Sequence, residues 1–245
     1  MEHLEIDTPY GEPSGPVAIG TVEGRRVAFL PRHGVKHQFP PHMINYRANL
    51  WAMKELGVER VLGPCAVGSL QARVKPGEFV ISDQLVDWTK GRPGTFYDGP
   101  VTTHVSFADP YCPTLREVSI SESTALDLPM HDRGTMIVIQ GPRFSTRAES
   151  KFFSAQGWDI IGMTQQPEAA LARELEMCFG NISLVTDYDV GVEGEIEAVT
   201  HEEVIRVFEA NIGRLRELLT RIIGKIPEER HCECATALAH ARFEV

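Results

Sequence analysis

The chain has 245 residues, of which 42% are hydrophobic and 24% are charged, a composition typical of a packed globular protein and not of a disordered chain. Its formal net charge of −10 disfavours a non-specific nucleic-acid or acidic-membrane surface, although a local basic pocket could still bind a small anion. The acidic N-terminus has no apolar signal core and no apolar run is long enough for a membrane span, so we expect a cytoplasmic protein.

Five cysteines are scattered along the chain: Cys65, Cys112, Cys178, Cys232 and Cys234. Their odd number and low density favour reduced thiols. The Cys232-Glu-Cys234 pair could instead form a redox-labile bridge or bind a metal. The sequence shows no second pair that would complete a zinc site, so we predict no bound metal.

The first part of the chain predicts one hairpin and one helix. Residues 1–15 are turn-rich, and we expect an irregular N-terminal segment. Two β-branched runs flank Glu23 and Gly24, a pattern that predicts a hairpin. Residues 31–42 contain three prolines and three histidines, which preclude a regular element. The spacing of apolar residues over 45–56, followed by a glycine, predicts a helix.

Strand and helix patterns alternate in the rest of the chain. We predict strands at 60–70, 78–88, 134–144, 158–163 and 178–189, and helices at 115–126, 146–156, 166–177 and from a capping box at 200–203 to about residue 223, before a C-terminal tail at 227–245. This alternation indicates an α/β fold, with residues 1–245 forming one domain around a mainly parallel sheet. Ligands bind at the carboxyl ends of strands in such sheets, so residues that follow strands are the first candidates for a site.

The loop after the hairpin is a candidate anion site. Arg32 offers a bidentate guanidinium and His33 a further donor. A rival interpretation makes His33, His37 and His42 metal ligands, although the glycine and prolines around them argue against a helical ligand pair. A polar surface loop would also explain the pattern.

Small and aromatic residues follow two of the predicted strands. At Ala66, Val67 and Gly68, small side chains would let a ligand approach backbone N–H groups, although an ordinary tight turn explains them equally well. Phe144, beside Ser145, could stack on a planar ring or simply belong to the core.

The last two predicted strands end in groups that could bind a sugar or a base. Gly162, Met163 and Thr164 offer a hydroxyl and an adaptable apolar surface, although Thr164 could instead cap the next helix. Asp187 and Asp189 point to the same side if the chain is extended there, so they could hold two atoms of one ligand. An Asx turn, a helix cap or a metal site are alternatives for this pair.

Several segments, in order from about residue 7 to residue 223, point together to one family: DTPYGEPS, PRHGVKH, INYRANLWAMKELG, AVGSL, KPGEFVISDQ, FYDG, DPYCP, GPRFSTRAES, IIGMTQQPEAALARE and LVTDYD. They resemble the trimeric purine nucleoside phosphorylases, in the branch of the methylthioadenosine phosphorylases. The resemblance implies a single-domain phosphorylase fold with a mixed, mostly parallel central sheet flanked by helices. It also implies a homotrimer or a dimer of trimers.

The resemblance also implies a phosphate site. Arg32, His33 and Thr164 would bind phosphate, with Cys65 and the backbone of Ala66 beside it. Phosphate would be a co-substrate, and no metal or organic cofactor would be needed.

The nucleoside would occupy the remaining candidates. By resemblance, Met163 would lie against the ribose hydroxyls, Phe144 would line the base pocket, and His104 would reach the 5′ region of a neighbouring subunit's site. Asp187 and Asp189 would bind the purine. The substrate-binding set would be completed by Val67, Gly68, Ser145, Gly162 and His201.

The implied reaction is an attack of phosphate on the anomeric carbon of a purine nucleoside, which releases the base and a pentose 1-phosphate for purine and methionine salvage. The departing purine gains negative charge, and Asp187 could protonate N7 if burial raises its pKa. Aspartates at both positions favour a 6-aminopurine, because a carboxylate accepts a hydrogen bond from the exocyclic amine. Methylthioadenosine is therefore the expected substrate, with adenosine or other purine nucleosides as alternatives.

Three departures from the family leave alternatives open. No glycine-rich phosphate segment precedes DTPYGEPS, and Cys65 stands where the family has a threonine or an asparagine, although a thiol is a poorer donor. His201 replaces an apolar residue and could bond a 5′-hydroxyl, or simply lie exposed in the first turn of a helix. A nucleoside-binding protein with weakened phosphate chemistry, or a metal-dependent hydrolase built on the three histidines, remain competing hypotheses.

Overall fold

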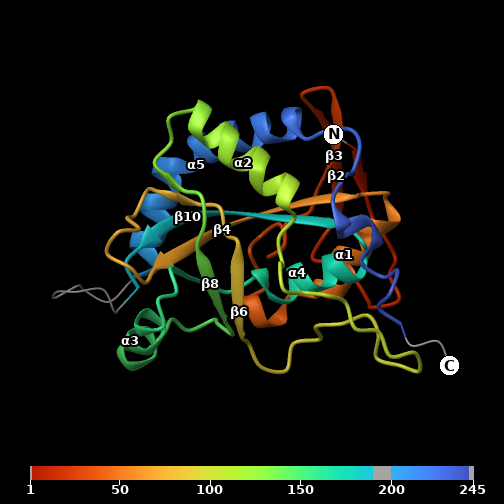
Figure 1. The fold of residues 1–245 in the computed structure, drawn as a ribbon, viewed down its shortest axis with the longest axis horizontal. Helices are drawn as coiled ribbons and strands as arrows, with labels where there is room; N and C mark the ends of the chain where they lie inside the picture. Colours follow the sequence, from red (N-terminus) through yellow and green to blue (C-terminus); the bar gives the residue numbers. More distant parts are fainter. Residues whose placement is uncertain (1, 190–199, 243–245) are drawn as a thin grey trace.

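The computed structural model describes residues 2–189 and 200–242 (Figure 1). Its described part contains a seven-stranded sheet in the order β6-β8-β9-β4-β10-β5-β7. Four of the six neighbouring pairs in this sheet are parallel, and β4–β9 and β10–β5 are antiparallel, which confirms the mixed, mostly parallel sheet. The strands are β4 (Arg60–Ser69), β5 (Phe79–Val80), β6 (Gln84–Trp88), β7 (Met130–His131), β8 (Thr135–Ile139), β9 (Ile160–Gly162) and β10 (Cys178–Asp187).

Helices cover the two faces of this sheet. Helices α2 and α5 lie together on one face and α1 and α4 on the other, while α3 lies at one end (Figure 1). Their bounds are α1 (Tyr46–Glu55), α2 (Pro113–Ala125), α3 (Arg147–Ala155), α4 (Gln165–Glu174) and α5 (His201–Lys225). Strand β10 is buried along its whole length, as expected for a strand covered on both sides. None of the helices in the described residues is both long and apolar enough to cross a bilayer.

The N-terminal hairpin is confirmed, and it is part of a second sheet. Strands β2 (Val17–Val22) and β3 (Arg25–Phe29) pair around Glu23 and Gly24, which both have positive φ as a tight hairpin turn requires. Strand β1 (Glu2–Leu4) pairs antiparallel with β2, so the prediction that all of residues 1–15 are irregular was wrong. The local sequence gives no sign of this strand, because it is formed by pairing with the edge of β2.

The predicted strand at 78–88 is also wrong as a single element. It divides into β5, which pairs with β10 and β7, and β6, which pairs with β8 at the far edge of the sheet. Two polar side chains hold the break: Ser82 Oγ donates to Asn181 Oδ1 (2.7 Å), and Asp83 Oδ1 accepts from the backbone N–H of Gly134 (2.9 Å). These side-chain bonds add to backbone bonds from Ile81 and Asp83 to the carbonyls of His131 and Gly134, so the polar groups of the break are satisfied.

The predicted helices agree well with the structure, and their ends follow local signals. Asn45 caps α1 by accepting from the backbone N–H of Ala48, and Thr146 and Glu149 form a capping box at the start of α3. The described short 3-10 helices are Pro41–Met43 and Glu233–Thr236, the second of which lies in the predicted C-terminal tail.

Candidate active site

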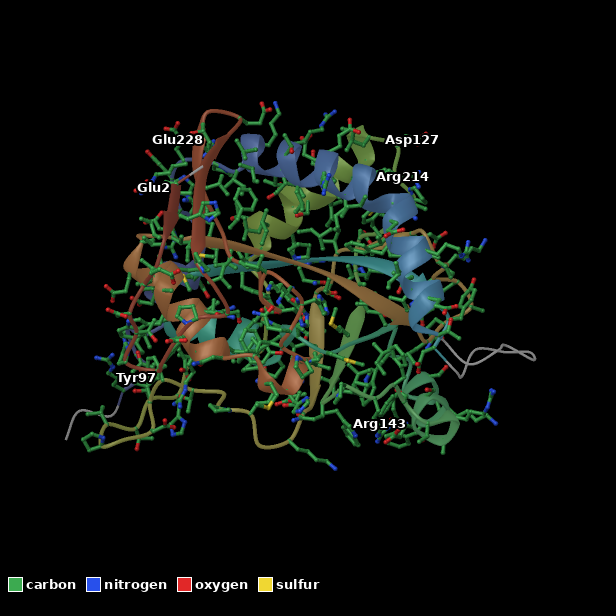
Figure 2. All side chains as sticks on the ribbon, turned by 180° about the vertical axis from the view of Figure 1, so that it is seen from behind. Glu2, Tyr97, Asp127, Arg143, Arg214 and Glu228 are labelled. Atoms are coloured by element: carbon green, nitrogen blue, oxygen red, sulfur yellow. The ribbon has the colours of Figure 1, made fainter. Side chains whose placement is uncertain are left out.

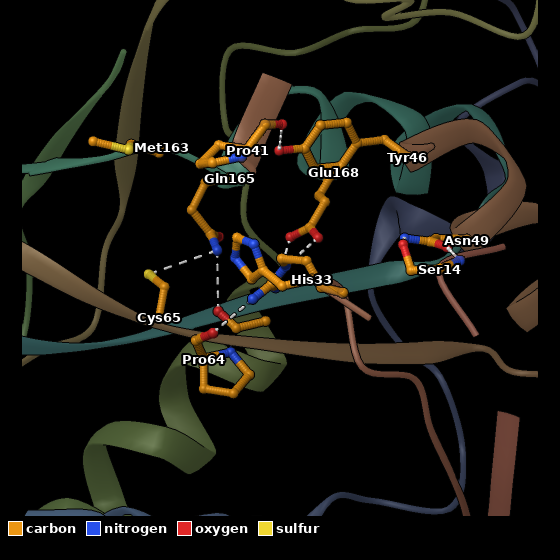
Figure 3. Close-up of polar contacts among 12 residues, drawn as sticks. Ser14, His33, Pro41, Tyr46, Asn49, Pro64, Cys65, Met163, Gln165 and Glu168 are labelled. Carbon is orange, nitrogen blue, oxygen red and sulfur yellow. Dashed lines mark hydrogen bonds and ion pairs between the residues drawn. The ribbon is translucent and has the colours of Figure 1, made fainter. Parts of the chain in front are cut away.

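Arg32 forms a buried ion pair with an acidic residue that the sequence analysis missed. Its Nε and Nη2 donate to the two carboxylate oxygens of Glu168 at 2.5 and 2.8 Å, and Nη1 donates to the carbonyl of Pro64 at 3.0 Å (Figure 3). Burial alone lowers the pKa of the guanidinium, but Glu168 outweighs this effect and the pKa is raised. Arg32 therefore stays charged, and among the described residues two of its N–H groups remain for another anion.

His33 lies next to this pair and is oriented by the backbone. Its Nδ1 lies 2.9 Å from the carbonyl of Phe39, so Nδ1 carries a proton and Nε2 is the acceptor in the neutral ring. Burial lowers the pKa of His33. Arg32, His33 and Glu168 all line a cavity of about 720 Å³, bounded by β3, β4, α1 and α5.

Strand β4 positions the remaining candidates in a row. Its two edges pair differently: residues 60–68 run parallel to β10, with Gly68 opposite Asp187, and on the other edge Gly68 and Ser69 pair antiparallel with β9, Gly68 opposite Ile161. Beyond this pair the chain stays close to β4, since a Cβ at Gly162 would lie 3.4 Å from a side-chain carbon of Val67. Further on, Gln165 Nε2 lies 3.1 Å from the carbonyl of Gly63 and 3.8 Å from Cys65 Sγ.

Residues at the carboxyl ends of strands were expected to form the site, as in a mainly parallel sheet, but β9 runs antiparallel to β4. From the pair Gly68–Ile161, β9 therefore runs back along β4. The candidates are therefore spread along β4, from Pro64 beside Arg32 to Gly68 beside the two aspartates. At about 3.3 Å per residue, this row is about 13 Å long.

Cys65 is a neutral thiol among polar neighbours. Its Sγ accepts from Asn181 Nδ2 at 3.3 Å and lies 3.5 Å from Ser183 Oγ. Burial raises the pKa of Cys65, so the thiol remains protonated near neutral pH. Residues 66–69 continue the strand and do not form the tight turn that was considered for them.

Thr164 and Met163 lie at the end of β9. Thr164 is 5% exposed and occupies the N-cap position of α4, but its side chain makes no capping hydrogen bond. The Met163 sulfur packs over the Gly141 turn, close to Pro41. Arg92 fixes this region, because its Nη1 donates to the carbonyls of Met163 (2.8 Å) and Gln166 (2.6 Å).

Asp187 and Asp189 lie together at the end of β10 and are both buried, with exposed fractions of 7% and 3%. Thr186 Oγ1 donates to Asp187 Oδ2 at 2.8 Å, and Ser150 Oγ donates to Asp189 Oδ2. Both aspartates approach Gly68: a Cβ there would lie 2.9 Å from Asp187 Oδ1 and 3.2 Å from the Asp189 Cβ. The two aspartates therefore both lie buried beside Gly68, and their binding to one ligand stays a prediction.

The other predicted substrate residues are less closely grouped. Phe144 is 40% exposed, and Ser145 Oγ is buried without a hydrogen-bond partner among the described residues. Arg143 anchors this turn to α3 through Glu149, at the end of the molecule away from Glu2 (Figure 2).

Two predicted residues belong to other parts of the chain. His104 lies in the loop beside the C-terminal tail, where its N–H donates to the carbonyl of Ala241 at 2.8 Å. His201 begins α5, but its side chain lies outside the described residues.

The structure bears on the two metal sites that the sequence raised, one at the three histidines and one at Cys232 and Cys234. His33 stacks on His37, with ring centroids 4.4 Å apart, but these two histidines and His42 do not converge as a metal-binding group within the described residues. The argument that no second cysteine pair could complete a site with Cys232 and Cys234 was wrong. Separate elements bring the side chains of two distant cysteines to this pair: Cys112 and Cys178.

Glu168, Arg92 and Ser150 are the residues that sequence reasoning missed. Each was included in a predicted helix or loop and was given no separate role. The available signal was Glu168, an acidic residue directly before the apolar residues Ala169, Leu171 and Ala172 on the buried face of α4. A buried carboxylate needs a partner, and Arg32 supplies it.

Gly68→Ala should disrupt the acidic site. The added Cβ would lie within 3.0 Å of both Asp187 Oδ1 and Ile161, so we expect a loss of stability of about 1–3 kcal/mol together with weaker purine binding. The control is Gly213→Ala on α5, where nothing lies within 4 Å and a gain of about 0.5–1 kcal/mol is expected. Urea unfolding and nucleoside titration measure both effects, and unchanged binding in Gly68→Ala would contradict the placement of the aspartates.

Comparisons with known proteins identify the family. The sequence profile of the Phosphorylase superfamily matches residues 1–224. This chain belongs to that superfamily. It is 57% identical to the S-methyl-5′-thioadenosine phosphorylase of Thermofilum pendens, over 97% of this chain and 89% of that protein. It is 52% identical to the purine nucleoside phosphorylase of Streptomyces coelicolor, over 97% of this chain and 88% of that protein.

Solved phosphorylase structures have the same fold. A mutant adenosine/methylthioadenosine phosphorylase from Schistosoma mansoni, in complex with adenine, superposes with a TM-score of 0.94 at 33% identity, over 100% of this chain and 95% of that one. A methylthioadenosine phosphorylase from an antarctic soil metagenomic library gives a TM-score of 0.93 at 39% identity, over 99% of this chain and 85% of that one. The fold expected from the sequence resemblance is therefore confirmed.

Proposed function

We propose that this phosphorylase cleaves S-methyl-5′-thioadenosine with phosphate and releases adenine and a pentose 1-phosphate. One observation carries the proposal: the order of groups along β4. A cationic pocket at Arg32 comes first, then the segment after β9, which carries Met163 and Thr164 and contacts Cys65 through Gln165, and finally the acidic pair beside Gly68. These groups would bind an anion, a sugar and a base in that order, which is the arrangement of a nucleoside attacked by phosphate. The names of the relatives support the same substrate.

The phosphate half needs a fixed cation and further donors. Glu168 holds Arg32 in place, and the two N–H groups that remain could contact adjacent phosphate oxygens. His33 would donate when protonated, and Thr164 would add its hydroxyl. Phosphate would serve both as nucleophile and as the anion that faces the positive charge that develops on the sugar. The proposed chemistry requires phosphate as co-substrate and no other group.

The part of the site that would bind the purine also supplies the general acid. In the proposed reaction Asp187 protonates or hydrogen-bonds N7 of the departing purine, which leaves more easily as its negative charge is neutralised. The position of Asp187 supports this role, because its carboxyl group is buried beside Gly68 at the same end of the row as Asp189. Asp189, held by Ser150, would accept from the exocyclic amine of adenine.

Asp189→Asn should shift base preference toward 6-oxopurines. The amide can donate to a 6-oxo group, whereas an ionised carboxylate repels it. We expect the ratio of kcat/KM for inosine to that for methylthioadenosine to rise about 10–100-fold. This is the effect on the ratio of gaining one buried hydrogen bond to inosine and losing one to methylthioadenosine. Parallel initial rates with the two nucleosides measure this ratio. An unchanged ratio would show that Asp189 does not contact the base edge.

We also propose a cytoplasmic homotrimer or dimer of trimers. His104 supports a shared site, because its loop is held to the C-terminal segment, where its backbone N–H donates to the carbonyl of Ala241. In a trimer it would reach the 5′ substituent in the neighbouring subunit. His201 could bond a 5′-hydroxyl, in which case adenosine would also be a substrate.

One observation favours a second candidate function. Glu168 already neutralises Arg32, and the thiol at Cys65 is a weak donor, so the phosphate pocket has less free positive charge than its residues suggest. A purine-nucleoside-binding protein with weak phosphate chemistry would have these features.

A single assay separates the two functions. Methylthioadenosine, adenosine and inosine are incubated side by side with and without phosphate, and base release is followed by chromatography. The phosphorylase predicts rapid release of adenine from methylthioadenosine only when phosphate is present. Tight nucleoside binding by calorimetry without turnover at high phosphate would favour the binding protein instead.

A further inference from the structure

Four cysteines from three separate parts of the chain meet in one place. Cys112 occupies the N-cap position of α2, Cys178 begins β10, and Cys232 and Cys234 lie at the second 3-10 helix of the C-terminal tail. All four sulfur atoms lie within 4.8 Å of one another, and Sγ of Cys178 and Sγ of Cys232 are 3.3 Å apart. The remaining cysteine, Cys65, lies on β4 and is not part of this cluster.

We propose that this cluster binds one Zn²⁺ ion as a closed, structural tetrathiolate site. Zinc prefers four ligands in a tetrahedron with Zn–S distances of about 2.3 Å, which places neighbouring sulfurs about 3.8 Å apart. The observed cluster has this size, so a central ion would need only small side-chain adjustments. Four protein ligands leave no open position for a substrate, as in zinc sites that serve stability.

The arrangement favours a metal over two disulfides. All four cysteines are free thiols, and their sulfurs form one compact group and not two separate pairs. A disulfide between Cys232 and Cys234 would close a very small ring, which strains the geometry of the bond. Zinc requires no oxidant; it binds the four thiolates as their protons are released.

The surroundings suit a buried, negatively charged metal complex. Cys112, Cys178 and Cys234 are at most 3% exposed and belong to the apolar core between α2, α5 and β10. A Zn²⁺ ion with four thiolates carries a net charge of −2, which requires a nearby cation or hydrogen-bond donor. Arg230 lies beside Cys178 and supplies both, since its Nε–H is buried without a hydrogen-bond partner among the described residues.

The position of the cluster indicates what the ion would do. The ten-residue strand β10 separates Cys178 from Asp187 by about 30 Å, so the ion would take no part in cleaving a nucleoside. It would join the tail to α2 and to the first residue of the central strand. Arg60 strengthens the same junction by donating to the carbonyls of Pro227 and Glu228 at 3.0 and 2.8 Å.

Metal analysis of the purified chain tests the site. The protein is prepared with reductant and without chelators, and zinc is measured by plasma mass spectrometry. We expect one zinc per chain in the wild type, none in Cys232→Ser/Cys234→Ser, and one in the control Cys65→Ser. The double variant should also melt at a lower temperature with its turnover at low temperature unchanged. Wild-type protein that neither contains zinc nor takes up an equimolar amount under reducing conditions would overturn the proposal.

A second measurement on the wild type keeps the test independent of whether the variants fold. Cobalt added to the reduced, zinc-free protein should give the intense visible absorption of a tetrahedral Co²⁺ thiolate at one equivalent. Mass spectrometry of unreduced protein should show all five thiols intact. A mass lower by two hydrogens per bridge, with no cobalt band before reduction or after it, would show that the cysteines pair with one another.

Discussion

Asp187→Ala should lower kcat for methylthioadenosine phosphorolysis by about 10²–10⁴-fold, the usual contribution of a positioned general acid. The substitution removes the only proton donor that we assign to the departing purine, together with its hydrogen bond from Thr186. Steady-state rates at saturating nucleoside and phosphate measure the effect. The control is Asp132→Ala, which alters an exposed aspartate paired loosely with Arg133 at 3.8 Å and should leave the rate unchanged.

The fold of the Asp187 variant must be checked separately. Asp187 is the last residue of β10, so its replacement could destabilise the end of the strand as well as remove the proton donor. Thermal melting and adenine binding distinguish these effects: an intact fold that still binds adenine, with slow turnover, supports the role as acid. Full turnover in a folded variant would exclude it.

Arg32→Ala should affect both stability and phosphate binding. It leaves Glu168 as an unpaired charge, and breaking a buried ion pair on one side costs about 3–5 kcal/mol in the free energy of unfolding. Phosphate should also lose its main cation, so its KM should rise while nucleoside binding persists. The control is Asp98→Ala, which removes a mostly exposed partner of Arg47 and should cost at most about 1 kcal/mol.

A double variant separates the two roles of Arg32. In Arg32→Ala/Glu168→Gln the uncompensated charge is gone, so much of the lost stability should return in urea unfolding. The KM for phosphate should stay high, because the guanidinium is still missing. Recovery of phosphate affinity in the double variant would show that Arg32 acts only as a partner of Glu168.

Much of the fold follows from local sequence signals. The hairpin at Glu23 and Gly24 and the helices that begin after Asn45 and Thr146 all depend on residues close in the chain, so these elements could be predicted. The errors at β1, at the β5–β6 break and in the direction of β9 have a common cause. Each depends on pairing between distant segments, and neither propensity nor spacing reports which strand becomes the neighbour.

The candidate site shows the same division. The spacing of Asp187 and Asp189 predicted that the two aspartates lie close together, and both do approach Gly68; their role, like that of Arg32 toward phosphate, stays a prediction. The partner that holds Arg32, Glu168, is distant in sequence and lies on a helix with an ordinary pattern. The cysteine cluster was missed for the same reason, because Cys112 and Cys178 are far from the Cys232 pair until the sheet is formed.

Phosphorus NMR on the products of one reaction distinguishes phosphorolysis of the nucleoside from its hydrolysis. Purified protein is incubated with methylthioadenosine and inorganic phosphate while adenine is measured in parallel. The account predicts one equivalent of a pentose 1-phosphate for each adenine released, and no adenine without phosphate. Adenine formed at the same rate without phosphate, together with a free sugar and no new phosphorus signal, would contradict it.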